Sequence, residues 1–175
     1  MQKTCISKNW LLSAPGTNGF VPVDLPNDYA VSQKRDPHAP GGGANGFYPC
    51  GTGRYLKYMR FPEDTEHVIL DVDGAYMLTT MCLNDDQLAI HPHGYTPFLL
   101  DLTSHIRRGH TNKIELMTQC LQPSTRWYSG AGVYRDVFLW TGGRVRVEPW
   151  DIFVKTKLCD DGAAVVTAEY AVSSD

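Results

Sequence analysis

The chain has 175 residues, of which 42% are apolar and 20% charged, a composition that allows a buried core and argues against global disorder. Its net charge of -3 does not favour a nucleic-acid-binding protein, because such proteins usually carry a basic excess. No apolar run approaches the roughly 20 residues of a membrane-spanning helix, so we expect neither a nucleic-acid nor a membrane partner.

The first forty residues contain few periodic segments, and the prolines around Val21–Asp24 restrict any strand there to a sheet edge. The glycine-rich segment 40–46 follows and predicts a loop. Such a loop is either a mobile surface segment or one that lies against a ligand. In the second case small residues allow close approach, and Asn45 supplies a donor and an acceptor.

From residue 55 onward, short segments rich in β-branched and aromatic residues alternate with turns, as is typical of strands. Lys113–Gln119, for example, places Ile114, Leu116 and Thr118 on one face, and Asn84–Asp86 predicts a hairpin turn between two strands. The expected strands are 55–61, 67–73, 77–83, 87–90, 97–103, 113–119, 133–140 and 144–148. Without crossover helices between them, these strands predict an all-β sandwich.

A domain boundary is expected near Glu148–Trp150. Beyond it, residues 152–156 and 164–172 predict two strands joined by a turn at Cys159–Gly162. Two strands cannot bury a core by themselves. We therefore divide the chain into one domain at 1–147 and the incomplete start of a second domain at 148–175.

The five cysteines are odd in number and form no C-x-x-C pair, which argues against a disulfide framework and a zinc site. They are predicted to be reduced thiols packed as small apolar residues, in a cytoplasmic protein. His91 and His93 lack a third ligand nearby and are expected to hydrogen-bond locally. No metal and no cofactor are expected.

Arg126, Trp127 and Tyr128 stand in a segment that enters a strand. An arginine beside two aromatic rings offers donors and flat apolar faces, which suit sugar hydroxyls and ring C–H groups. The alternative is structural: one of the aromatic rings plugs the end of the sandwich while Arg126 pairs locally. No pair of carboxylates forms a convincing catalytic centre, so no catalytic residue is assigned.

The run from Arg126 to Val137 resembles the signature of the N-terminal sugar-binding domain of glycoside hydrolase family 2, which includes β-galactosidases, β-glucuronidases and β-mannosidases. Asn45–Pro49 resembles a loop of some β-galactosidases whose asparagine reaches the substrate pocket. Further segments that fit the family, in the same order along the chain, are 24–29, 51–55, 70–76, 94–98, 101–103 and 147–150.

The resemblance implies a jelly-roll (galactose-binding-domain-like) sandwich for 1–147 and an immunoglobulin-like sandwich that starts at 148. It also implies a catalytic barrel, placed third, with two glutamates that act as acid/base and nucleophile. A barrel needs about 250 residues, so the chain is expected to be a fragment that is inactive alone.

In this interpretation the chain is the non-catalytic N-terminal domain of a β-galactosidase-like enzyme and supplies loops to the rim of the barrel. The expected substrate contacts are Arg126, Trp127, Tyr128 and Asn45; in several family members an aspartate occupies the position of Arg126. The expected partners are a β-linked glycoside and the downstream immunoglobulin-like and barrel domains, and a homo-oligomer stays open. The alternatives are a free-standing carbohydrate-binding module and a structural assembly domain.

Overall fold

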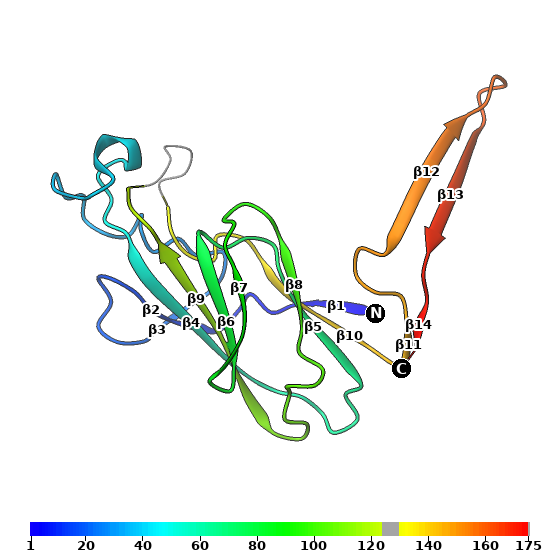
Figure 1. Ribbon diagram of the computed structural model, residues 1–175, viewed down its shortest axis with the longest axis horizontal. Helices are drawn as coiled ribbons and strands as arrows, with labels where there is room; N and C mark the ends of the chain where they lie inside the picture. Colours follow the sequence, from blue (N-terminus) through cyan, green and yellow to red (C-terminus); the bar gives the residue numbers. More distant parts are fainter. Residues whose placement is uncertain (124–129, 175) are drawn as a thin grey trace.

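The structure is a computed structural model and describes residues 1–123 and 130–174. Two antiparallel sheets face each other (Figure 1). The four-stranded sheet has the order β1 (Gln2–Cys5), β10 (Val137–Gly142), β5 (His67–Val72) and β8 (Phe98–Asp101). The six-stranded sheet has the order β3 (Val21–Val23), β2 (Trp10–Ser13), β4 (Gly51–Arg60), β9 (Thr111–Cys120), β6 (Leu78–Leu83) and β7 (Asp86–His91).

The core lies between the two sheets, and the predicted all-β sandwich is confirmed. Val68 and Leu70 of β5 meet Ile114 and Leu116 of β9 in one buried apolar cluster. Thr118 is also fully buried, so the predicted inward face of β9 is correct. Alternation works here because successive side chains of a strand point to opposite faces of the sheet. No helix among the described residues is long and apolar enough to cross a membrane.

Three predicted strands exceed the observed strands by three residues or more, and the first of them, 97–103, shrinks to β8 (Phe98–Asp101). The predicted strand at 133–140 begins only at Val137, because residues before it bond to segments outside the sheet ladder, for instance through Asn27 N–H to Val133 O (2.8 Å). The predicted strand at 144–148 shrinks to β11 (Val145–Arg146). The predicted hairpin turn is confirmed: Leu83 pairs with Asp86 across Asn84 and Asp85, which both have positive φ.

The last segment forms a hairpin that extends away from the sandwich (Figure 1). Strands β12 (Ile152–Leu158) and β13 (Ala164–Tyr170) pair along their full length, and every residue of both strands is exposed. β14 (Ser173–Ser174) returns to pair with β11. Both predicted strands therefore exist, while the domain boundary near residue 148 stays a prediction.

The prediction of five reduced thiols is wrong for two of them, because Cys50 and Cys120 form a disulfide. Cys50 directly precedes β4 and Cys120 ends β9, and the pairing of Gly51 with Cys120 brings the two Cα atoms to 5.4 Å, a normal distance for a disulfide. Their separation of 70 residues hides this pair from any local motif.

Candidate functional site

The loop that carries Asn45 lies at one end of the sandwich, far from the hairpin β12–β13 (Figure 1). It contains the 3-10 turn η1 (Gly42–Asn45) and runs into β4. The Gln122 side chain, just past the end of β9, donates from Nε2 to Tyr48 O (3.1 Å). Ala131, which follows residues 124–129 in the chain, accepts at its carbonyl oxygen from Tyr29 N–H (2.9 Å). The described residues that flank 124–129 therefore lie at the same end as this loop.

Glycines determine the shape of the loop. Gly46 ends η1 in the left-handed conformation (φ 60°), which glycine adopts without strain, and its N–H bonds back to carbonyls of the turn. A Cβ on Gly41 would lie only 2.7 Å from Cβ and Cγ of Asn45. The absence of a side chain at Gly41 therefore lets the Asn45 side chain lie directly against the backbone.

The Asn45 side chain is fully buried, at 0% exposure, yet neither its Nδ2 nor its Oδ1 has a hydrogen-bond partner. Burial of an amide without partners costs about 1–3 kcal/mol. Most buried polar groups in folded proteins are paired, so an unpaired one requires an explanation. Chemically, this amide can donate two hydrogen bonds and accept two.

The other polar groups described at this end bind the loops to each other. Asp28 Oδ1 accepts from the N–H groups of Ala30 and Ala131, both at 2.9 Å. Tyr29 Oη donates to Gly51 O (2.8 Å), and burial raises the pKa of Tyr29 to about 12. These contacts hold the segment before the Asn45 loop against β4 and against the residues that follow 124–129.

Of the residues predicted to contact substrate, the structure places one. Asn45 lies in the loop cluster described above, whereas Arg126, Trp127 and Tyr128 lie outside the described residues. His91 Nε2 and His93 Nδ1 both lie within 3.2 Å of Thr96 Oγ1, which agrees with their expected local role. Within residues 1–123 and 130–174, no group of three or more His, Cys, Asp or Glu side chains could hold a metal ion.

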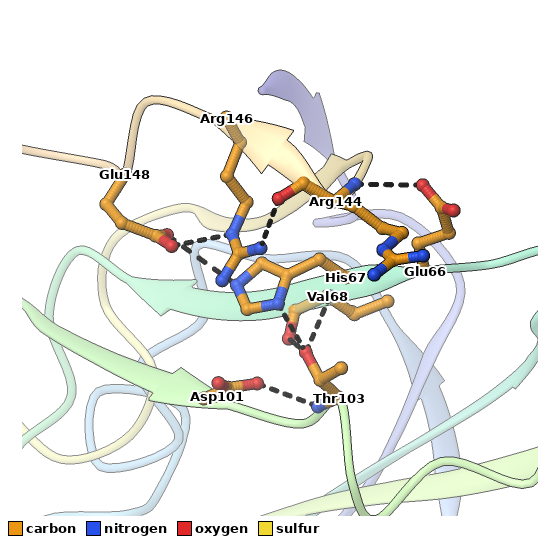
Figure 2. Close-up of polar contacts among 8 residues, drawn as sticks. All are labelled: Glu66, His67, Val68, Asp101, Thr103, Arg144, Arg146 and Glu148. Atoms are coloured by element: carbon orange, nitrogen blue, oxygen red, sulfur yellow. Dashed lines mark hydrogen bonds and ion pairs between the residues drawn. The ribbon is translucent and has the colours of Figure 1, made fainter. Parts of the chain in front are cut away.

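A second polar cluster, which the sequence did not reveal, lies where the chain leaves the sandwich for the hairpin (Figure 2). His67, at the start of β5, has Nδ1 2.9 Å from Thr103 Oγ1 and Nε2 3.6 Å from Glu148 Oε2. Arg146 Nε donates to Glu148 Oε1 (2.6 Å). Beside this cluster is a hollow of about 330 Å³, lined by His67, Asp101, Thr103, Ser104, Arg108 and Arg146.

The contacts of this second cluster join the outgoing segment to the sandwich. The N–H of Arg144 donates to Glu66 Oε2 (2.9 Å), and the Arg146 guanidinium donates to Arg144 O (3.2 Å) as well as to Glu148 (Figure 2). The charged groups of this cluster are therefore paired mainly with one another. This arrangement fastens residues 144–148, and we assign it no ligand.

No protein-family model matches the chain. The chain is 32% identical over 152 residues to Beta-galactosidase BoGH2A from Bacteroides ovatus, an alignment that covers 85% of this chain and 18% of that enzyme.

Two solved structures show the same fold. A beta-glycosidase from Bacteroides vulgatus matches with a TM-score of 0.89 and 23% identity, over 100% of this chain and 24% of that one. A glycosyl hydrolase family 2 member from Bacteroides cellulosilyticus matches with a TM-score of 0.81 and 22% identity, over 99% of this chain and 29% of that one. The resemblance to family 2 glycoside hydrolases is thereby confirmed, and the chain spans less than a third of the length of each of these relatives.

Proposed function

We propose that this chain, a homologue of part of the family 2 glycoside hydrolases, is the non-catalytic N-terminal sugar-binding domain of such an enzyme. Its Asn45 loop lines the rim of an active site whose catalytic residues belong to another domain of the full protein. The coverage supports this assignment: the chain aligns over most of its own length with only 18% of a β-galactosidase. The substrate is then a β-linked glycoside, most simply a β-galactoside.

The observation that carries the proposal is the unpaired amide of Asn45. Sugar hydroxyls both donate and accept hydrogen bonds, so an amide with free donors and acceptors suits them. A buried polar group whose desolvation cost is already paid gains more from a new partner than one that must first leave water. In the described conformation the amide is covered, so the loop must shift to present it.

The Arg126–Tyr128 segment belongs to the same proposal on sequence grounds. The described residues on both sides of 124–129 lie at the end of the sandwich that carries Asn45. A guanidinium and an amide that approach one sugar from neighbouring loops would fix its orientation through several donors. Residues 148–175, with the exposed apolar side chains of β12 and β13, are proposed to begin the second, immunoglobulin-like domain.

The test is the substitution Asn45→Ala in the full-length enzyme, with Asn18→Ala as the matched control because Asn18 is exposed and lies in a different loop. We expect Asn45→Ala to lower kcat/KM for a chromogenic β-galactoside by about tenfold, which corresponds to about 1.4 kcal/mol. Asn18→Ala should leave it unchanged. A folded Asn45→Ala enzyme with wild-type kcat/KM would contradict the proposal.

A further inference from the structure

The Cys50–Cys120 disulfide lies directly beside the Asn45 loop. Cys50 follows Asn45 by five residues, and Cys120 precedes by two residues the Gln122 side chain that bonds to Tyr48 O. We propose that Cys50 and Cys120 are positioning residues for Asn45, so that the site is complete only in the oxidised protein. This inference rests on the function proposed above.

The pairing of β4 with β9 does not depend on this crosslink, which stabilises the whole fold mainly by restricting the unfolded chain over a 70-residue loop. β4 and β9 already pair without interruption from Gly51–Cys120 to Arg60–Thr111, and both contribute to the buried core. A disulfide at the very end of such a ladder adds little to the pairing of the two strands. Its effect is expected on the chain that leaves the ladder, which is the loop at 41–49.

The hydrogen bonds of that loop are mostly internal. Phe47 N–H donates to Gly42 O (2.9 Å) and Tyr48 N–H to Asn45 O (3.2 Å), while Asp36 N–H, from the segment before the loop, donates to Phe47 O (2.8 Å). Such bonds hold the loop together and do not fix its position relative to the sheet. The disulfide and the bond from Gln122 to Tyr48 O join it to the end of β9.

The two ends of the loop therefore differ in stiffness. At one end, glycines 41–43 carry no side chain that would restrict the backbone, with Gly42 at φ 51°, and only hydrogen bonds such as that from Gly42 N–H to Ala39 O (2.9 Å) hold this end. At the other end, Cys50 is covalently fixed to a strand of the core. The loop can then open at its glycine end and present the Asn45 amide, while its other end stays fixed to β9 through Cys50.

Reduction by a dithiol such as dithiothreitol would break this disulfide and free the loop from the end of β9. A thiolate of the reagent attacks one sulfur to give a mixed disulfide, and its second thiol then displaces the protein thiolate. The reagent becomes a cyclic disulfide, and its two electrons and two protons leave Cys50 and Cys120 as free thiols. Cys50 is partly exposed and Cys120 is buried, so the reagent reaches the disulfide from the side of Cys50.

The reverse reaction needs a disulfide-bearing oxidant, with which the two cysteines exchange. We therefore place the mature protein in an oxidising compartment, in place of the cytoplasm expected from the cysteine count.

Hydrogen exchange on the 175-residue chain tests this role of the disulfide without any activity measurement. We expect reduction, and independently the double substitution Cys50→Ser/Cys120→Ser, to speed exchange of amides 41–48 at least tenfold while amides 104–110, in the loop between β8 and β9, change less than twofold. The control Cys5→Ser/Cys159→Ser keeps the disulfide and should match wild type. Unchanged exchange in 41–48, or an equal rise in 104–110, would overturn the proposal.

A double-mutant cycle in the full-length enzyme tests the link to Asn45. In the oxidised enzyme Asn45→Ala should cost about tenfold in kcat/KM, whereas in the Cys50→Ser/Cys120→Ser background it should cost less than about threefold. Equal losses in both backgrounds would refute the positioning role. No loss in the oxidised enzyme would refute the proposed function, while hydrogen exchange would still decide whether the disulfide fixes the loop.

Discussion

Alanine substitutions of Asn45 and Asn112, made one at a time, test whether the Asn45 amide is held without partners. Both side chains have 0% exposure. Asn112 Oδ1 accepts from Arg107 N–H and Asn84 Nδ2 (both 2.8 Å), and its Nδ2 donates to Arg107 O (2.9 Å) and His110 O (3.0 Å). At about 1 kcal/mol of net stabilisation for each bond, Asn112→Ala should lower the free energy of unfolding by about 3–4 kcal/mol.

Asn45→Ala removes no hydrogen bond that the structure shows. It removes the cost of an unpaired buried amide, about 1–3 kcal/mol, and leaves a small cavity against Gly41 that costs about 0.5–1 kcal/mol. The free energy of unfolding should therefore stay the same or rise by up to about 2 kcal/mol. Two substitutions of the same residue type at the same burial are thus expected to differ, because only Asn112→Ala lowers the free energy of unfolding.

The measurement is urea unfolding of the chain, followed by tryptophan fluorescence and circular dichroism, with equal m-values as the check on two-state behaviour. A stable Asn45→Ala beside a strongly destabilised Asn112→Ala would support the argument. If Asn45→Ala loses as much stability as Asn112→Ala, the amide has partners in solution, and its free hydrogen-bonding capacity can no longer be cited for a sugar site.

Three further predictions concern other parts of the molecule. The chain alone should not hydrolyse chromogenic β-galactosides or β-glucuronides, and turnover that co-purifies with it and exceeds a blank-expression control would contradict this. Limited proteolysis should cut the exposed hairpin β12–β13 first and leave a core that ends near Val147, whereas hydrogen-exchange protection of the hairpin equal to that of β10 in the monomer would contradict it. Burial raises the pKa of Tyr29 to about 12, so its neutral form stabilises the fold fully below pH 10, and that contribution should be lost as the pH rises from 10 to 12. The loss should approach about 2–3 kcal/mol and be absent in Tyr29→Phe, so equal high-pH slopes for the two proteins would refute this assignment.

What the sequence predicted well depends on neighbours along the chain. The inward face of β9 and the turn at Asn84–Asp85 follow from alternation and turn chemistry, which act over a few residues. The hairpin β12–β13 was found in the same way.

What the sequence missed depends on contacts between distant segments. The bond between Cys50 and Cys120 exists because β4 and β9 share a register, and no spacing rule predicts the partner of a given strand. The cluster of His67 with Thr103 and Glu148 likewise joins three separate segments. The role of Asn45 was suggested by family resemblance, but its unpaired amide could be recognised only from its burial and the absence of hydrogen-bond partners in the folded structure.

The buried polar atoms without hydrogen bonds distinguish Asn45 from the polar groups near the start of the hairpin and in β5. Around the outgoing segment, His67 Nε2 and Glu148 Oε2 lack hydrogen bonds but lie 3.6 Å from each other, so a small shift would pair them. In β5, Asp71 Oδ1 is unpaired, but Oδ2 of the same carboxylate binds Lys3 Nζ (3.0 Å) and Trp140 Nε1 (2.8 Å). Among the buried side chains that the structure describes, Asn45 is the one whose donor and acceptor atoms both lack a partner. A fold that satisfies its other buried side chains at least in part leaves this amide entirely unpaired at a loop end, and that contrast is what the proposed sugar contact would explain once the loop shifts.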